Sequence, residues 1–550
     1  MEIIERIPQL TNSHAMKKTS NVWPLFWRGI SFAALIHLIA FDLLILNAPE
    51  MLQVQFTPDD GYYYLTLARN FVRFGQWTFD GGVSVTSGFH LIQAYVLAGF
   101  YKLLQPTLDG FVRLGLGFDA LITIIAVCIA WWICLRKNDA FHLIAFTILV
   151  TAKPFLFNSV SVTEWPLVIL IAGLYCLSFY QQEKSHGAPL ALFVLGLLGS
   201  LARSDFGLLP FGIFISALFM ERGNTNKPLA RESLVGVLGA VLGLGLVFVH
   251  NFVTTRTFIQ SSALMKSYWA TFVHQKFYNA MALVLKVIGL DLGFADFDRS
   301  IFLLGVLLIS GPLILVVLAK LSGQKDVTFA KVGASANQPL RERVLVLAAG
   351  FCLIGYSIFY AYNGAIQHWY TANLTWPIFI LLVAGAHYLD QRLLKEGQFT
   401  LIWLSVFALT ALVVQISSLY PLRSQTSPWP HQQVMLEAGR YLAQNPLDAY
   451  VGSWNSGVVG YYRDAADIIN IDGLVNNDIY PYAVGNSLPD YLREKNIGYI
   501  LDFENMLHPP FPERGGYDDA NFLSQLEPVK EFDQGQFEEF KFLRLYRIKQ

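Results

Sequence analysis

The chain has 550 residues, of which 54% are hydrophobic and only 14% are charged. Soluble globular chains carry about 25% charged residues, so this composition excludes an ordinary soluble protein and predicts a polytopic membrane protein. Residues 421–550 hold 11 Lys+Arg and 18 Asp+Glu, net −7, which leaves 28 and 22, net +6, for residues 1–420. The acidic C-terminal part argues against a nucleic-acid partner. All four cysteines lie in apolar runs, so we expect no disulfide framework.

Apolar runs follow one another along residues 1–420. The first, 25–48, is long enough to cross a membrane, and the polar stretch before it favours a retained signal-anchor over a cleaved signal peptide. The later runs are 88–104, 111–135, 139–157, 166–181, 187–203, 206–220, 232–252, 301–320, 344–362, 371–390 and 399–418.

Lys and Arg residues cluster in alternate loops, which the positive-inside rule assigns to the cytoplasm. The loop 49–87 and the C-terminal part 421–550 then fall outside. Run 88–104 conflicts with this parity. Because it is short and polar in places, we expect it to be a partial, re-entrant or interfacial helix. The predicted fold is a polytopic α-helical membrane protein with about eleven spans, a partial helix and a C-terminal soluble α/β domain.

The C-terminal part, 421–550, has the pattern of a small α/β domain. Residues 448–455, 467–472 and 497–503 have the composition of strands, and 488–496 that of a helix. This order predicts a small parallel or mixed sheet. The predicted organisation is therefore a membrane module, 1–420, followed by an outer α/β domain, 421–550.

Two adjacent carboxylates, Asp59 and Asp60, follow the first apolar run in "FTPDDGYYYLTLARN". The apolar spacing after them predicts an amphipathic helix from about 60 to 73. One interpretation is that the pair only caps this helix, since Asp is favoured in a first turn. The other is a general base at the membrane face, where partial desolvation tunes the pKa of a carboxylate. In that case we expect Tyr63 and its neighbours to form the floor of the site.

Further polar residues fall at the predicted outer boundaries. Each has a plain interpretation as an end charge, local ion pair or aromatic-belt residue, and a functional one as a contact for a phosphate or a sugar. Arg203 and Asp205 form such a pair in "LARSDFG". The candidates for substrate contacts are Tyr63, His90, Glu164, Arg256, Lys266, His368, Trp369 and Tyr370.

Motifs for several other chemistries are missing from the sequence. It contains no P-loop, no GxSxG, no HExxH and no cysteine pair with zinc spacing. The carboxylates are concentrated on outer loops rather than mid-span, which disfavours a proton-coupled transporter. Two alternatives to an enzyme stay open: a transporter or flippase of lipid-linked sugars, and a non-catalytic cell-envelope assembly protein.

The segments "DDGYYYLTLARNFVRFGQWTFDG" and "VTSGFHLI" closely resemble the first outer loop of the GT-C superfamily of membrane glycosyltransferases, which includes protein mannosyltransferase, aminoarabinose transferase and arabinofuranosyltransferase types. "SVTEWPL", "LARSDFG" and "QHWYTANL" resemble later family segments in the right order, and "VGSWNSGVVGYYRDAADIINIDGLVN" resembles a fused outer domain. Ser87 replaces an Asn of the family pattern, and Leu91-Ile92 replaces Pro-Leu. These departures bear on acceptor preference more than on mechanism.

The resemblance implies sugar transfer from a polyprenyl-phosphate donor to a glycan, lipid or protein hydroxyl, at the extracytoplasmic face of a bacterial inner membrane. Asp59 would then be the base, Asp60 would support it or bind the acceptor, and Lys266 or Arg256 would steady the leaving phosphate. Some members of the family need a divalent metal such as Mg²⁺, Mn²⁺ or Ca²⁺ and others do not. Asp60, Glu164 and His90 are the candidate ligands here.

Overall fold

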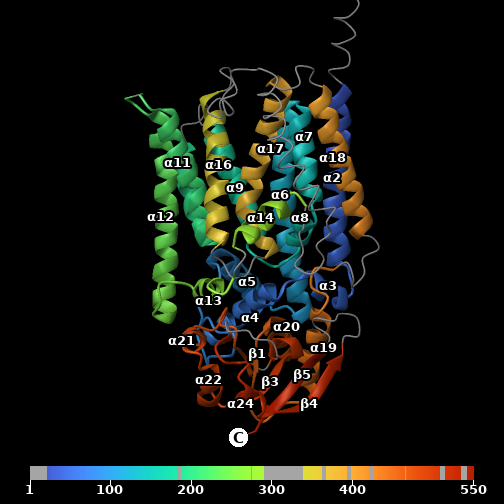
Figure 1. Cartoon of the computed structure of the whole chain (residues 1–550), viewed down its shortest axis with the longest axis vertical. Helices are drawn as coiled ribbons and strands as arrows, with labels where there is room; N and C mark the ends of the chain where they lie inside the picture. Colours follow the sequence, from blue (N-terminus) through green and yellow to red (C-terminus); the bar gives the residue numbers. More distant parts are fainter. Residues whose placement is uncertain are drawn as a thin grey trace, which may run out of the picture.

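The structure is a computed structural model of the chain, and its elements form a helical bundle with a smaller mixed domain at one end (Figure 1). It describes residues 22–181, 188–223, 225–273, 276–289, 339–361, 367–392, 398–419, 427–464, 466–507, 514–533 and 542–549. The predicted run 301–320 and most of the following loop therefore lie outside the described residues.

The part before the C-terminal domain is helical throughout its described residues. Its elements are α2 (Val22–Leu46), α3 (Glu50–Phe56), α4 (Asp59–Phe74), α5 (Leu91–Leu104), α6 (Leu108–Lys137), α7 (Ala140–Thr151), α8 (Lys153–Asn158), α9 (Trp165–Gln181), α10 (Ala188–Ala202), η2 (Ser204–Gly207), α11 (Leu208–Met220), α12 (Pro228–Thr255), α13 (Ser261–Ala270), α14 (Lys276–Val287), α16 (Leu340–Ala361), η4 (His368–Thr371), α17 (Ala372–Arg392) and α18 (Gln398–Leu419).

The predicted apolar runs within the described residues coincide with helices, except that run 139–157 is divided at Ala152 between α7 and α8. Five segments are long and apolar enough to cross a membrane: Val22–Leu46, Leu108–Lys137, Pro228–Thr255, Leu340–Ala361 and His368–Asp390. Other apolar helices are shorter, and the total of about eleven spans stays a prediction. α5 has 14 residues, below the usual spanning length of about 17, as expected for a partial or interfacial helix.

Bundle helices pack through small residues as well as bulky ones. α10 and α12 make the most extensive contact in the bundle. A Cβ added to Gly239 on α12 would lie 2.1 Å from the carbonyl oxygen of Phe193 on α10, so the two backbones touch there. Such close approach is how membrane helices gain packing energy without a hydrophobic driving force between them.

The C-terminal domain is built on a five-stranded sheet in the order β2-β1-β3-β5-β4. β1 pairs in parallel with β2 and β3, whereas β5 pairs antiparallel with β3 and β4. The mixed sheet is confirmed, although the last two strands were not predicted. The elements are α19 (Gln432–Gln444), β1 (Tyr450–Ser453), α20 (Gly457–Arg463), β2 (Ile468–Asn470), α21 (Ile479–Val484), α22 (Leu488–Glu494), β3 (Ile497–Phe503), α23 (Glu504–Leu507), α24 (Ala520–Leu523), β4 (Leu526–Asp533) and β5 (Phe542–Ile548).

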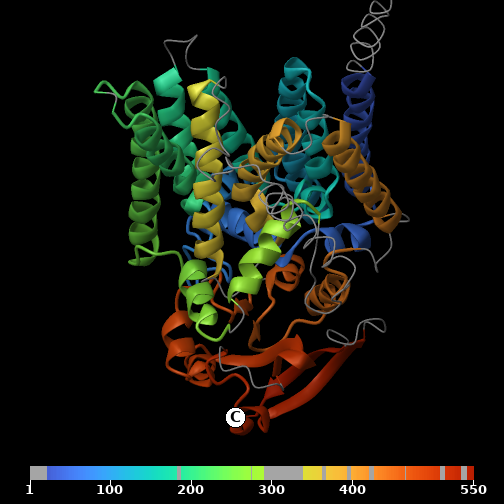
Figure 2. The same cartoon turned by 45° about the horizontal axis from the view of Figure 1, so that its top comes forward.

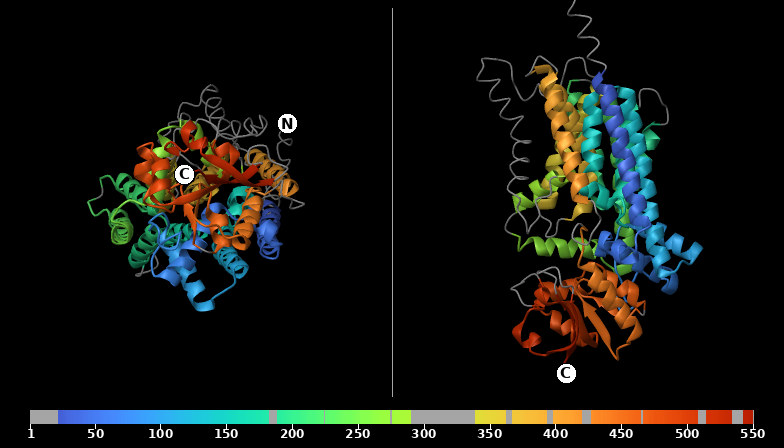
Figure 3. Two further views of the ribbon diagram at one scale, coloured as in Figure 1. Left: turned by 90° about the horizontal axis from the view of Figure 1, so that it is seen from below. Right: turned by 90° about the vertical axis from the view of Figure 1, so that its right-hand side faces the viewer.

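α4 lies at the junction of the bundle and the C-terminal domain, outside the long apolar helices (Figure 1). It begins after Pro58, whose extended backbone suits an N-cap, and both carboxylates occupy its first turn. It ends at Gly75, which adopts the left-handed conformation that stops a helix. The turned views show the C-terminal domain across this end of the bundle (Figures 2 and 3).

Candidate active site

A polar cavity of about 110 Å³ lies at the junction between the bundle and the C-terminal domain. Seven of the predicted site residues line it: Asp60, Tyr63, His90, Glu164, Lys266, Trp369 and Tyr370. They come from α4, α13, η4 and the segments before α5 and α9. Residues that are distant in the sequence therefore meet around one small volume.

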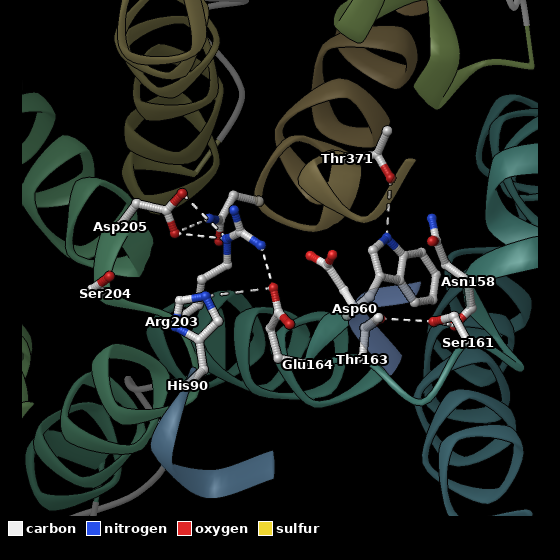
Figure 4. Close-up of polar contacts among 12 residues, drawn as sticks. Asp60, His90, Asn158, Ser161, Thr163, Glu164, Arg203, Ser204, Asp205 and Thr371 are labelled. Atoms are coloured by element: carbon white, nitrogen blue, oxygen red, sulfur yellow. Dashed lines mark hydrogen bonds and ion pairs between the residues drawn. The ribbon is translucent and has the colours of Figure 1, made fainter. Parts of the chain in front are cut away.

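A buried ionic network forms one wall of this cavity. The guanidinium of Arg203 contacts Glu164, and its Nε donates to Asp205 at 2.9 Å (Figure 4). The same guanidinium lies 4.9 Å from the ring centre of Tyr370. Burial alone would raise the pKa of Glu164, but His90 and Arg203 outweigh it and hold that pKa below its usual value. Glu164 is therefore ionised, and Arg203 is fixed between two carboxylates.

Asp60 is the carboxylate of the pair that lines the cavity. Its Oδ2 lies 3.9 Å from Nζ of Lys266, which is also 5.2 Å from the ring centre of Tyr370. Burial raises the pKa of Asp60, and the positive charge of Lys266 offsets part of this increase. A carboxylate with a raised pKa on a cavity wall has the properties required of a general base.

Asp59 faces the C-terminal domain instead. Its two carboxylate oxygens accept hydrogen bonds from the backbone N–H groups of Gly457 and Val458, each at 3.0 Å. These donors belong to the first turn of α20, where helix N–H groups have no partner within the helix. Burial raises the pKa of Asp59 to about 6, although the two backbone donors favour the charged form. Both carboxylates lie in the first turn of α4, as the capping interpretation expected, and Asp59 also accepts bonds from the start of α20.

The geometry thus distinguishes the two carboxylates, and Asp59 as the base stays a prediction. Asp60 is on the cavity wall, and Asp59 is not among the residues that line it. Adjacent residues on a helix point about 100° apart, so a pair at the start of α4 cannot serve one site equally. The sequence could not tell which of the two faces the cavity.

α4 is attached to the C-terminal domain along its length. At its far end, Arg69 donates to the carbonyl of Tyr461 at 3.0 Å and lies 3.1 Å from Asp464. In its middle, the hydroxyl of Tyr63 donates to Asp472 at 2.8 Å. Burial raises the pKa of Asp472 to about 8. The helix that carries Asp60 is therefore held by a domain some 400 residues further along the chain.

Sequence reasoning missed Asp472 and its neighbours as parts of the site. Leu474 lines the cavity directly, and its carbonyl would lie 1.6 Å from a Cβ added to Gly88. Ser87 N–H donates to the side chain of Asn477 at 2.9 Å. The signal that could have identified them is the group of polar residues in "NIDGLVNND", at the end of β2 and directly after it. Their polar side chains do not fit the apolar pattern of a buried strand or helix.

Two predicted contact residues lie away from the cavity. Arg256 ends α12 in the left-handed conformation, with its guanidinium 5.8 Å from the ring centre of Phe252. His368 packs edge-on against Phe157 and Trp429. Neither is among the residues that line the cavity, so a role for them in binding stays a prediction.

The three candidate metal ligands line the cavity but do not form a ligand set. Nε2 of His90 lies 3.6 Å from Oε1 of Glu164, the oxygen that also contacts Arg203. Oε2 of Glu164 accepts a hydrogen bond from Tyr64. In the part of the chain that the structure describes, Asp60, Glu164 and His90 do not come close enough together to share an ion. A guanidinium takes the place of a cation beside Glu164, and we derive no step through a metal here.

Comparison with known proteins gives one family match, over residues 424–546, to a domain of unknown function (DUF8728). A comparison with curated proteins finds no match. The chain is similar to the crystal structure of ArnT from Cupriavidus metallidurans bound to undecaprenyl phosphate, at 13% identity and a TM-score of 0.49, over 93% of this chain and 97% of that one.

Two further similar structures are of an oligosaccharyltransferase from Archaeoglobus fulgidus. One is a complex with zinc and sulfate, at 11% identity and a TM-score of 0.45, over 94% of this chain and 73% of that one. The other, AglB with an inhibitory peptide and a dolichol-phosphate, has the same identity and TM-score over 94% and 74%. At these scores the likeness assigns no role to any residue of this chain.

Proposed function

We propose that this protein is a membrane glycosyltransferase that moves a sugar from a polyprenyl-phosphate donor to a hydroxyl group of a glycan, lipid or protein acceptor. The observation that carries the proposal is the convergence of separate motifs on one cavity. The segments around Asp60, His90, Glu164, Arg203 and Tyr370, each of which resembles a GT-C segment, all contribute to its lining. Chance similarity of single short motifs would not bring them together.

The reaction needs a base, an electrophilic carbon and a stabilised leaving group. In our proposal, Asp60 accepts the proton of the acceptor hydroxyl while that oxygen attacks the anomeric carbon. The bond from that carbon to the phosphate oxygen breaks, and polyprenyl phosphate leaves with the bonding electrons. Lys266, 3.9 Å from Asp60, is close enough to stabilise the departing phosphate through a charge-assisted hydrogen bond.

The aromatic residues of the cavity suit a sugar substrate. Trp369 and Tyr370 are almost fully buried, and their rings present apolar faces beside the charged groups. Tyr370 is stacked on Tyr360, with ring centres 5.3 Å apart, which fixes its orientation. Rigid rings and fixed charges can position a donor without reorganisation during the reaction.

The proposed orientation places the cavity and the C-terminal domain outside the cytoplasm. The support is the distribution of positive charge. Arg136 and Lys137 end α6 and Arg392 ends α17, and these helices run away from the C-terminal domain (Figure 1). A donor whose lipid tail lies in the membrane could then enter the cavity from the outer leaflet. The bacterial inner membrane is proposed from the resemblance to bacterial GT-C enzymes.

The test uses purified full-length protein in lipid vesicles, with a panel of polyprenyl-phosphate sugars and lipid, glycan and peptide acceptors. Asp60→Asn removes the base with little change in size. We expect transfer to fall by about 10²–10⁴-fold, while donor binding stays within a few-fold of the original protein. Asp490→Asn, on an exposed residue of the C-terminal domain, is the matched control.

Other outcomes distinguish the alternatives. If Asp59→Asn abolishes transfer and Asp60→Asn does not, Asp59 is the base and our assignment is wrong. If the protein moves lipid-linked sugars across vesicles and Asp60→Asn has no effect, it is a flippase. If it binds no donor at all, the glycosyltransferase proposal fails in favour of an assembly role.

A further inference from the structure

A second cluster of ionisable side chains lies at the opposite end of the bundle. It consists of Asp139 and His142, at the start of α7, and His387, near the end of α17. The carbonyl of Leu108, at the start of α6, accepts a hydrogen bond from Tyr461 of the C-terminal domain. The 30 residues of α6 span about 45 Å, so the cluster near its other end is remote from the polar cavity.

The three side chains converge on one point. Oδ2 of Asp139 lies 2.5 Å from Nδ1 of His142 and 2.9 Å from Nε2 of His387. The three donor atoms all lie within 4.8 Å of one another. The other oxygen, Oδ1, faces the backbone N–H of Phe141 at 3.4 Å and caps α7. Oδ2 of Asp139 thus contacts the two histidines, whereas Oδ1 caps α7. The proposed transfer reaction uses none of these groups.

The surroundings of the cluster favour a positive charge. Asp390 lies one turn after His387, and its Oδ1 is buried without a hydrogen-bond partner among the described residues. Glu342 is already paired with Lys137 at 2.8 Å, so that pair adds little net charge. Asp139 and Asp390 therefore place two carboxylates near two imidazoles, a set that can bind a cation when the imidazoles are neutral. A buried carboxylate oxygen without a partner is costly unless something binds it.

We propose that Asp139, His142 and His387 bind a divalent transition metal, with Zn²⁺ the ion that best matches the donor set. Imidazole nitrogen and carboxylate oxygen are typical zinc ligands, and three protein ligands leave a fourth position for water. Tetrahedral zinc with bonds of about 2.0–2.2 Å needs ligand atoms about 3.3 Å apart. The contacts to Asp139 would open by less than about 1 Å to reach this spacing.

Such a site would be a structural clamp. It would join the α6–α7 corner to α17, two parts of the chain separated by 248 positions between Asp139 and His387. Metal bound to the folded protein but weakly to the unfolded chain stabilises the fold in proportion to its occupancy. We therefore expect the free energy of unfolding to depend on metal bound at this cluster, which is remote from the proposed reaction site.

The experiment uses the full-length protein in detergent, stripped with a chelator and then supplied with Zn²⁺ alone. Elemental analysis after removal of free metal gives the amount of bound zinc, and thermal unfolding gives Tm. We expect His142→Gln and His387→Gln each to lose one equivalent of bound zinc relative to the original protein. In the original protein, Zn²⁺ should raise Tm by at least about 3 °C.

Glutamine is chosen because it can still donate a hydrogen bond to Asp139 but is a poor zinc ligand. The control, His250→Gln, changes a histidine that bonds to Tyr95 elsewhere in the bundle, and it should keep both the zinc and the Tm shift. Equal zinc contents in the original protein and both cluster variants would overturn the proposal. So would a Zn²⁺-dependent Tm shift that both cluster variants retain. A variant that does not fold is replaced by Asp139→Asn, for which the same loss of zinc is expected.

Discussion

Two cavities among the described residues differ more in charge than in size. The larger, about 230 Å³, lies among α6, α9, α16 and α17, and most of its lining is apolar. Its charged groups have partners: Lys137 is paired with Glu342, and His142 and His387, the proposed zinc ligands, both contact Asp139. The smaller, about 110 Å³, lies at the junction with the C-terminal domain and exposes Asp60. Fixed and partly unpaired charge, rather than volume, is what marks a site for polar chemistry.

The largest effect is expected from removing the positive charge of Arg203, which contacts two carboxylates beside the smaller cavity. Arg203→Met leaves Glu164 and Asp205 buried without their guanidinium. We expect the free energy of unfolding to fall by about 3–5 kcal/mol and transfer to be lost. Thermal unfolding in detergent measures the first effect, and sugar transfer measures the second.

The matched control is Arg440→Met, which breaks a pair with Glu50 in which the arginine is about half exposed. An exposed pair contributes about 0–1 kcal/mol, so the change should be small. If the two variants lose the same stability, the charges of the smaller cavity have no special importance for the fold.

A more moderate effect is expected from Asp59→Ala. The first N–H groups of α20 then lose their acceptors, which costs about 0.5–2 kcal/mol at a helix N-terminus. Because Asp60 follows Asp59 directly, its position should shift, and we expect transfer to fall about tenfold. Hydrogen exchange at the amides of Gly457 and Val458 should speed up in the variant. Unchanged exchange with unchanged transfer would show that Asp59 does not hold the two domains in register.

The pH dependence should be opposite for stability and for transfer. The folded protein holds the pKa of Asp59 at about 6, above the ordinary 3.8, so it binds this proton more tightly than the unfolded chain does. The contribution of Asp59 to stability is therefore full below 3.8, falls as the pH rises toward 6, and is constant above it. Transfer should instead rise over this range, because it needs ionised carboxylates.

Assays of Tm and transfer from about pH 4.5 to about pH 8 check both trends. Asp59→Asn should flatten the part of the stability curve that comes from Asp59. Transfer that stays constant down to the lowest pH would contradict a raised pKa for the carboxylate pair.

The smallest effect is expected in the larger cavity. Ala130→Leu adds apolar volume to its wall, away from every charged group of the smaller cavity. We expect transfer within about twofold of the original and little change in stability, since the added methyl groups enter space that is already there. A large loss of transfer would show that the larger cavity takes part in the reaction and that the contrast between the two is wrong.

The sequence predicted much of the fold, because hydrophobic periodicity reports local structure directly. α4 was expected from about 60 to 73 and runs from Asp59 to Phe74. The strands β1, β2 and β3 were expected, and they are largely buried. β4 and β5 were missed. β4 forms the edge of the sheet, and its mostly exposed residues lack the alternation that reveals a half-buried strand.

The membership of the site was predicted better than its geometry. Seven of the residues that line the cavity were predicted from short motifs, because each motif can be recognised from neighbouring residues in the sequence. The choice between Asp59 and Asp60 depends on α20, which begins 398 positions after Asp59. The residues around position 59 in the sequence contain no pattern that predicts a contact with the start of α20. The same holds for Asp472, which reaches Tyr63 across the domain junction.

The bond between Asp59 and the start of α20 also has a consequence for biosynthesis. The ribosome makes Asp59 early and Gly457 398 residues later, which takes about 20–80 s at 5–20 residues per second. Until then, Asp59 lacks the two backbone N–H donors that hold it. A chain that stops before α20 would lack the contacts that Asp59 makes there. The C-terminal domain must therefore be made before the start of α4 has all of its contacts.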